Sequence, residues 1–210
     1  MQASTTALIL VDLQVDFMPF GMLPVAEGDQ VVPIANALMS EYETVVATQD
    51  WHPGNHGSFA ANHPWRKPGQ TIDLHGLQQV LWPIHCVQGT WGSEFADALN
   101  EDGITKVFQK GMDPEVDSYS GFYNNGHRNS TGMAEWLKAQ GIDEVHVMGL
   151  AADFCVKFTV LDALGEGLKT TLIEDATRGV NLEPGDVEKA VVEMREAGAL
   201  VVDSKDLLGA

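Results

Sequence analysis

Cysteine is scarce in this sequence. Among its 210 residues only Cys86 and Cys155 are cysteines, and they are too far apart to form a Cys-x-x-Cys motif. Two cysteines cannot build the disulfide framework of a small secreted domain, and the missing motif removes the common redox and zinc-ribbon signatures. We therefore predict a reducing, cytoplasmic setting for the chain.

Basic residues are also few. The chain has 12 lysines and arginines against 30 aspartates and glutamates, which gives a formal net charge of -18. Nucleic acids and anionic membrane surfaces are bound through basic patches, so this charge balance argues against both as partners. We expect the negative charge to serve solubility.

Long hydrophobic runs and nucleotide-binding motifs are missing as well. The apolar run at residues 7–11 is short, is broken by Asp12 and follows no positive charge, so we expect neither a signal peptide nor a membrane span. The chain contains neither Gly-x-Gly-x-x-Gly nor Gly-x-x-x-x-Gly-Lys-Ser/Thr. Their absence counts against a flavodoxin-like nucleotide binder.

Apolar, β-branched stretches alternate with helical patterns along the chain. The composition, 44% hydrophobic and 20% charged, is that of an ordinary globular protein, and the length fits one domain over residues 1–210. Strands are predicted at residues 7–13, 44–48, 105–108, 144–150, 169–173 and 199–202, and helices at residues 29–42, 93–100, 131–140, 153–165 and 183–197. This alternation predicts a three-layer α/β/α domain whose mostly parallel sheet has about six strands.

Two long segments, residues 50–92 and 111–129, show no periodicity. Each directly follows a predicted strand, and long irregular segments in a compact domain are usually functional loops.

Four polar residues end or follow predicted strands: Asp12, Asp50, Lys110 and Cys155. Ligands of parallel α/β sheets bind beyond the carboxyl ends of the strands, so we expect these side chains to meet on one rim. Taken singly, each could be a capping or surface residue. Asp175, after the fifth predicted strand, is interpreted as structural.

Cys155 lies just past a predicted core strand and in the first turn of a predicted helix. We expect Asp153 to cap that helix, and its inner face to consist of Phe154, Phe158, Leu161 and Leu164. Unpaired backbone N–H groups and the positive end of the helix dipole would favour a thiolate at Cys155. The alternative is a buried, inert cysteine.

Histidines gather in the loop that follows Asp50. In an extended backbone Asp50 and His52 point to the same side, and His85 could supply a second imidazole. Two histidines and a carboxylate suit Zn²⁺, Fe²⁺ or Mn²⁺, and the sequence does not choose among these ions. The alternative interpretation is a histidine cluster that is solvated or satisfied by backbone hydrogen bonds.

The motifs in this chain resemble those of the nicotinamidases in the isochorismatase-like cysteine hydrolase superfamily. The matching segments span most of the chain in the family's order: residues 12–17 (DLQVDF), 47–52 (ATQDWH), 82–90 (WPIHCVQGT), 110–111 (KG), 119–122 (YSGF) and 149–156 (GLAADFCV). One such motif would be weak evidence, but the complete set is specific.

The resemblance implies a role for each matching residue. Cys155 would be the nucleophile, with Asp12 and Lys110 completing a catalytic triad. A non-proline cis peptide before Ala151 would aim the N–H groups of Ala151 and Cys155 at one point, as an oxyanion hole. The implied metal ligands are Asp50, His52 and His85, with His56 as a candidate further ligand, and the implied substrate-binding residues are Phe17, Trp82 and Tyr119.

The implied activity is metal-dependent hydrolysis of nicotinamide to nicotinate and ammonia through a thioester, a reaction of NAD salvage. Zinc is the expected metal, with iron or manganese as alternatives, and pyrazinamide is an expected second substrate. The alternatives are a related amidase for a carbamoyl or ureido substrate, and a metal-binding regulatory module without turnover. The expected partner is a small molecule, and the chain could form a homo-oligomer.

Overall fold

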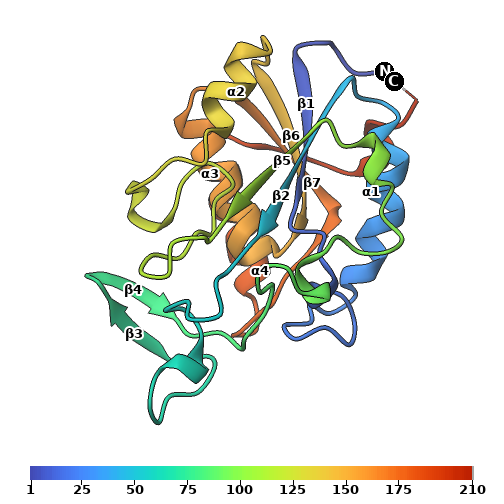
Figure 1. Cartoon of the computed structure of the whole chain (residues 1–210). Coiled ribbons are helices and arrows are strands. Elements are labelled where there is room, and N and C mark those ends of the chain that lie inside the picture. Colours follow the sequence, from blue (N-terminus) through green and yellow to red (C-terminus); the bar gives the residue numbers. More distant parts are fainter. Residues whose placement is uncertain (210) are drawn as a thin grey trace.

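The computed structural model describes residues 1–209 of the chain and shows two sheets (Figure 1). The strands of the main sheet are β1 (Thr6–Val11), β2 (Thr44–Asp50), β5 (Lys106–Lys110), β6 (Glu144–Leu150), β7 (Lys169–Arg178) and β8 (Leu200–Val202). A separate hairpin contains β3 (Thr71–Leu74) and β4 (Leu77–Val80).

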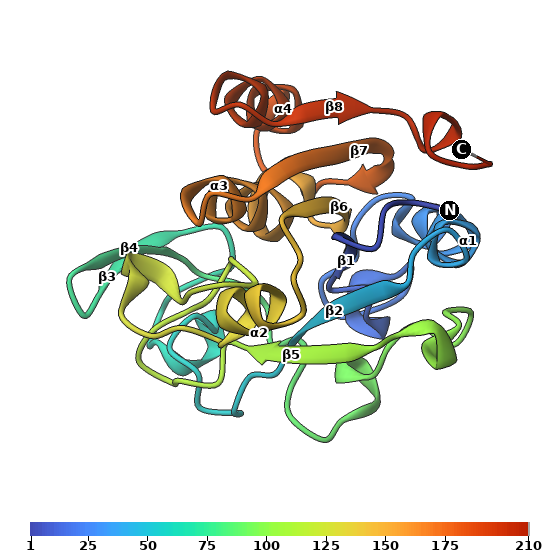
Figure 2. The same cartoon turned by 90° about the horizontal axis from the view of Figure 1, so that it is seen from above.

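The main sheet has the strand order β5-β2-β1-β6-β7-β8, and every neighbouring pair is parallel. Helices α1 (Val31–Met39), α2 (Met133–Ala139), α3 (Lys157–Gly165) and α4 (Asp186–Glu196) cover it. Figure 2 shows α1 on one side of the sheet and the other three helices on the opposite side. This arrangement confirms the predicted three-layer α/β/α fold.

The central strands are buried on both faces, which is why they read as continuous apolar runs rather than alternating ones. All six residues of β1 are buried. Leu8 and Leu10 of β1 pack in the core on the α1 side, while Ala7 and Ile9 pack in the core on the side of α2, α3 and α4. No helix within residues 1–209 is long and apolar enough to cross a membrane.

The strand order reverses beside β1. The chain builds outward from β1 through β2 to β5, then returns to place β6 on the other side of β1. Ligands of parallel α/β sheets bind at such a reversal, beyond the carboxyl ends of the strands. Gly149 near the end of β6 permits the close approach there, because a Cβ at this position would lie 2.2 Å from the carbonyl oxygen of Val11.

The prediction of a helix at residues 93–100 is wrong. Only short 3-10 turns occur here, at Trp91–Ser93 and Glu101–Gly103. Between them, residues 94–96 pair with residues 13–15, because Val15 N donates to Glu94 O at 3.0 Å and Ala96 N to Leu13 O at 2.9 Å, and a turn follows at residues 97–98. Tertiary hydrogen bonds have replaced the local helical ones.

The hairpin of β3 and β4 lies inside a segment that the sequence predicts to be irregular. Its two-residue turn is His75-Gly76, and both residues have positive φ, 52° and 85°. Such turns match the twist of a hairpin. The usual sequence signal for such a turn is Asn-Gly or Asp-Gly, so His75-Gly76 does not predict a hairpin.

The predicted helix at residues 153–165 exists, but its start differs from the prediction. A π-helical turn at Ala152–Val156 precedes α3, and Asp153 does not cap it. The Asp153 carboxylate instead accepts hydrogen bonds from the N–H groups of Val180 and Asn181, at 2.9 and 2.7 Å. The wider turn also changes which side chains face inward. Phe158 is exposed, whereas Val156, Thr159, Val160 and Ala163 are buried.

Candidate active site

Lys110 lies at the centre of a buried cluster of charged groups beyond the carboxyl ends of β1, β2, β5 and β6. Its ammonium forms ion pairs with Asp12, at 2.9 Å between Nζ and Oδ2, and with Asp50. Nζ also donates to the carbonyl oxygen of Ser118 at 2.9 Å and contacts the Sγ atom of Cys155 at 3.4 Å. The structure therefore brings together the four rim residues that the sequence singles out.

Asp12 is completely buried directly after β1, with a positive φ of 49°. The hydroxyl of Thr48, on β2, donates to its Oδ1 atom at 2.6 Å. Burial raises the pKa of the Asp12 carboxyl above its usual range, although Lys110 and Thr48 act in the opposite direction. The raised pKa makes the Asp12 carboxylate a stronger base, as proton transfer from a thiol requires.

Lys110 remains a cation although it is fully enclosed. Burial alone would lower the pKa of its ammonium, but the neighbouring carboxylates Asp12 and Asp50 outweigh that effect and raise it well above its usual range. The ion pair with Lys110 also changes the pKa of Asp50. Burial would raise the pKa of this carboxyl, but Lys110 and His52 hold it well below its usual range. A positive charge thus stays fixed within contact of the Cys155 sulfur.

Cys155 lies in the π-helical turn after β6 and is only 7% exposed. The thiolate that the helix start was expected to favour is not the form that this structure favours. Burial raises the pKa of the Cys155 thiol well above its usual range, and the opposing effect of Lys110 does not compensate. Without substrate the sulfur is therefore a neutral thiol.

Asp50, His52 and His85 form the second part of the site. Their ligand atoms all lie within 4.8 Å of one another, and Nε2 of His52 and of His85 are 3.5 and 3.8 Å from Oδ2 of Asp50.

The hydrogen bonds of both histidines leave the right nitrogen free for a metal ion. Nδ1–H of His52 donates to the carbonyl oxygen of Gly111 at 2.9 Å, and Nδ1–H of His85 donates to that of Pro83 at 2.8 Å. This tautomer leaves the Nε2 lone pair of each ring facing Asp50, which is the usual arrangement of metal-binding histidines. Two imidazoles and a carboxylate therefore fit a divalent transition metal.

Gln14 and Gly111, which lie in two of the matching segments but received no role from the sequence, hold this donor set in place. The side-chain amide of Gln14 brackets Asp50, accepting from its backbone N–H and donating to its carbonyl oxygen, both at 2.8 Å. Gly111, at a φ of 67°, lets His52 pack against the backbone, because a Cβ there would lie 2.4 Å from Cε1 of that ring. The glycine in the Lys110-Gly111 segment is the one signal that could have revealed these contacts, because Gln14 has no spacing relation to Asp50.

His56 does not join the set of Asp50 and His85. Its ligand atom groups instead with those of His52 and Asp117, again within 4.8 Å. The remaining histidines of the loop lie elsewhere: Nε2–H of His63 donates to Gly57 O at 2.7 Å, and His75 forms the hairpin turn.

A largely apolar cavity opens beside Cys155, Asp50, His52 and His85. Phe17, Trp82 and Tyr119 line it, as the resemblance implies. Leu23, Phe154 and Val180 line it too. Phe154 was expected in the helix core, and no pattern in the sequence marks Leu23 or Val180. The Leu150–Ala151 peptide at its floor is cis, as expected.

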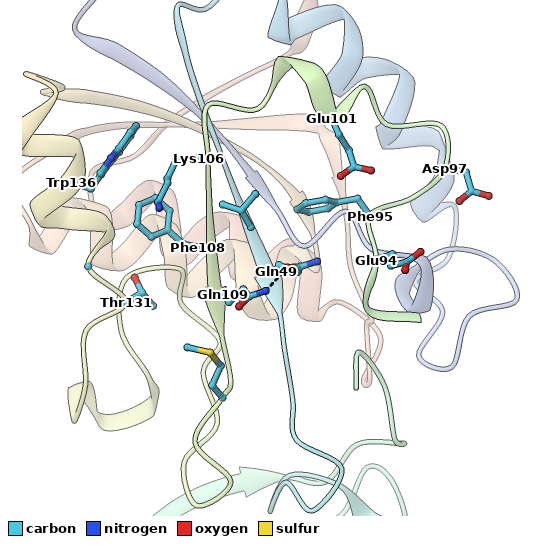
Figure 3. Close-up of a pocket in the computed structure, with 13 residues that line it drawn as sticks. Gln49, Glu94, Phe95, Asp97, Glu101, Lys106, Phe108, Gln109, Thr131 and Trp136 are labelled. Atoms are coloured by element: carbon cyan, nitrogen blue, oxygen red, sulfur yellow. Dashed lines mark hydrogen bonds between the residues drawn. The ribbon is translucent and has the colours of Figure 1, made fainter. Parts of the chain in front are cut away.

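A second groove runs along the exposed edge of β5. Figure 3 shows its side chains, including Glu94, Lys106 and Trp136. It contains none of the four rim residues and no histidine, so we do not place the reaction there.

A model of the isochorismatase domain matches residues 6–206 of the chain. The chain belongs to the isochorismatase domain family.

Its relatives within the family are similar over almost their whole length. The nicotinamidase of Escherichia coli strain K12 is 51% identical over 207 residues, covering 95% of each chain. A solved nicotinamidase and pyrazinamidase of Acinetobacter baumanii superposes with a TM-score of 0.96 at 46% identity and covers 99% of this chain and 100% of its own.

Two further solved structures contain ligands. PnC1 from L. infantum, in complex with nicotinate, has a TM-score of 0.86 at 36% identity and covers 98% of this chain and 96% of its own. The pyrazinamidase of Pyrococcus horikoshii, in complex with zinc, has a TM-score of 0.76 at 38% identity and covers 95% of this chain and 99% of its own.

Proposed function

We propose that this chain is a nicotinamidase, which hydrolyses nicotinamide to nicotinate and ammonia and also accepts pyrazinamide. The observation that carries the proposal is the convergence of Asp12, Lys110 and Cys155 beside a two-histidine, one-carboxylate donor set, under an aromatic cavity. The names and ligands of the similar proteins supply the substrate class.

In the first half of the reaction Asp12 takes the proton of the Cys155 thiol, and the sulfur attacks the carboxamide carbon. Asp12 then returns that proton to the amide nitrogen, so that the C–N bond breaks and ammonia leaves. The product of this half is a thioester on Cys155. N–H groups of Ala151 and Cys155 are proposed to hold the oxyanion, and each such donor contributes about 3 kcal/mol in comparable enzymes.

Water completes the reaction. Asp12 removes a proton from water, whose oxygen attacks the thioester carbon. The C–S bond then breaks, Asp12 returns that proton to the sulfur and restores the thiol, and the nicotinic acid leaves as nicotinate after giving its own proton to ammonia or solvent. Because burial raises the pKa of Asp12 as well as that of Cys155, the proton transfer has no pre-formed thiolate to start from. We therefore place the proton transfer in the substrate complex, with Lys110 stabilising whichever neighbour carries the negative charge.

Asp50, His52 and His85 would hold the metal ion. Zinc is the expected metal, with iron or manganese as alternatives. The bound ion would supply a Lewis acid that selects a ring with nitrogen meta to the amide. Phe17, Trp82 and Tyr119 are proposed to contact the faces and edge of that ring.

The nucleophile is tested by the variant Cys155→Ala, which removes only the sulfur from a small buried side chain. We expect ammonia release from nicotinamide to vanish while nicotinamide binding persists in calorimetry. Ammonia release at the wild-type rate would remove Cys155 from the mechanism. Assaying ammonia release from nicotinamide and from N-carbamoyl and ureido amides in parallel separates the proposal from a related amidase.

The metal is tested by removing it with a chelator and restoring it with Zn²⁺. We expect the KM for nicotinamide to rise in metal-free protein and to recover with zinc, while the unfolding midpoint changes less. An unchanged KM in protein shown to be metal-free would contradict the ring-selecting role.

A further inference from the structure

Two buried polar residues beside the cavity, His56 and Asp117, have no part in the reaction as described above. His56 is 0% exposed, and its Nε2 atom has no hydrogen-bond partner among residues 1–209. Asp117 is 3% exposed and lines the cavity. Buried polar groups are normally satisfied, so an unpartnered nitrogen in this position calls for a ligand.

The hydrogen bonds of His56 define which nitrogen carries its proton. The backbone N–H of Ser58 donates to Nδ1 of His56 at 3.2 Å, and the Ser58 hydroxyl lies 2.7 Å from the same atom. A backbone N–H can only donate, so Nδ1 is the acceptor and the neutral ring carries its hydrogen on Nε2. In this tautomer Nε2 has no lone pair for a metal and instead presents an N–H donor.

Asp117 presents the opposite kind of group. Its Oδ2 accepts from Nε2 of Gln79 and its Oδ1 from the backbone N–H of Ser118, each at 2.8 Å. A carboxylate can accept about four hydrogen bonds, so acceptor capacity remains. Within the described part of the chain no lysine, arginine or histidine forms an ion pair with Asp117, so this buried carboxylate lacks a direct countercharge.

The position of the pair relative to the metal-binding residues is also defined. His52 belongs to both sets of grouped ligand atoms, one with Asp50 and His85 and the other with His56 and Asp117. Since Nδ1 of His52 is bonded to the backbone, its ring has one nitrogen left and can bind one ion. The pair of His56 and Asp117 therefore cannot form an independent second site around His52.

We propose that His56 and Asp117 together bind a water that is itself a ligand of the ion held by Asp50, His52 and His85. The oxygen of that water would accept from Nε2–H of His56, and one of its hydrogens would go to the carboxylate of Asp117. The negative charge of Asp117 would help retain the cation. The inference rests on the metal site of the proposed function, and makes His56 and Asp117 positioning residues for the ion rather than direct ligands.

Zinc affinity tests the proposal in protein without substrate. We expect Asp117→Asn and His56→Gln each to weaken Zn²⁺ binding about 10- to 100-fold, the range found for outer-shell partners of metal ligands. Affinity is measured by competition with a chromophoric chelator, and circular dichroism of the metal-free variants checks their folding. Glu115→Gln, an exposed charge change in the same loop, is the matched control and should bind zinc as the wild type does.

Zinc X-ray absorption of the wild type distinguishes the water-mediated arrangement from direct ligation and needs no variant. We expect two imidazoles per zinc, and two again in His56→Gln. Three imidazoles in the wild type, or unchanged zinc affinity in both folded variants, would overturn the proposal. A wild type that binds zinc in this way but releases no ammonia from nicotinamide would instead refute the proposed function and leave the inference standing.

Discussion

Lys110 is the residue whose removal should damage the fold most among the groups of the site. Its side chain is fully buried and is the only cation paired with Asp12, at 2.9 Å, among residues 1–209. The variant Lys110→Met keeps the length and apolar stem of the side chain but removes its charge. Two carboxylates, Asp12 and Asp50, then lose their buried partner at once.

The expected cost follows from that geometry. Removing one partner of a buried ion pair typically destabilises a protein by about 3–5 kcal/mol. Domains of this kind unfold with about 5–15 kcal/mol in total, so the variant should lose a large fraction of its stability. We expect a clearly lower urea midpoint at pH 7.5 for metal-free Lys110→Met, in which no ion neutralises Asp50. Lys106→Met, an exposed change on the same strand, should stay within about 0.5 kcal/mol of the wild type.

The pH dependence gives the sharper test. Without Lys110 the pKa of Asp12 in the folded state rises further above its unfolded value, so the folded state binds more protons than the unfolded state. Stability of the variant relative to the wild type should therefore decrease as the pH rises from 5 to 8. Adding Asp12→Asn to Lys110→Met should recover about 0.5–3 kcal/mol. A Lys110→Met midpoint equal to that of the wild type, or no rescue and no pH dependence, would refute the reasoning.

Two further predictions use groups with shifted pKa values. The Thr48 hydroxyl lowers the pKa of Asp12, so Thr48→Val should move the acidic limb of the kcat/KM profile for nicotinamide to higher pH, and an unmoved limb would contradict Asp12 as the base. The other group is His146, which lies outside the candidate active site and whose Nδ1 atom is 2.6 Å from the Tyr42 hydroxyl. Burial lowers the pKa of His146. The unfolded chain then binds the extra proton first, so stability should fall as the pH drops below about 6.5, and His146→Asn should flatten this fall in urea titrations at pH 7.5 and 5.5.

The sequence alone determined the fold class and the residue types of the site. Buried parallel strands leave continuous apolar runs, and their carboxyl ends leave isolated polar residues after those runs, so β1, β2, β5 and β6 could be found with Asp12, Asp50, Lys110 and Cys155 beyond them. Spacing within one extended segment also placed Asp50 and His52 on one side. These features depend on residues close together in the chain, so they can be recognised in the sequence.

Tertiary structure decided what local patterns could not. The segment before residue 100 prefers extended pairing with residues 13–15 over a helix, and its sequence does not reveal that partner. Burial, which depends on the whole surrounding shell, raised the pKa of Cys155 where the helix start alone would have lowered it. The hydrogen bonds of Gln14 with Asp50, and the grouping of Asp117 with His52 and His56, join segments far apart in the chain. Such contacts arise only when the chain has folded, because spacing along the sequence encodes distance only within one regular element and not between segments far apart.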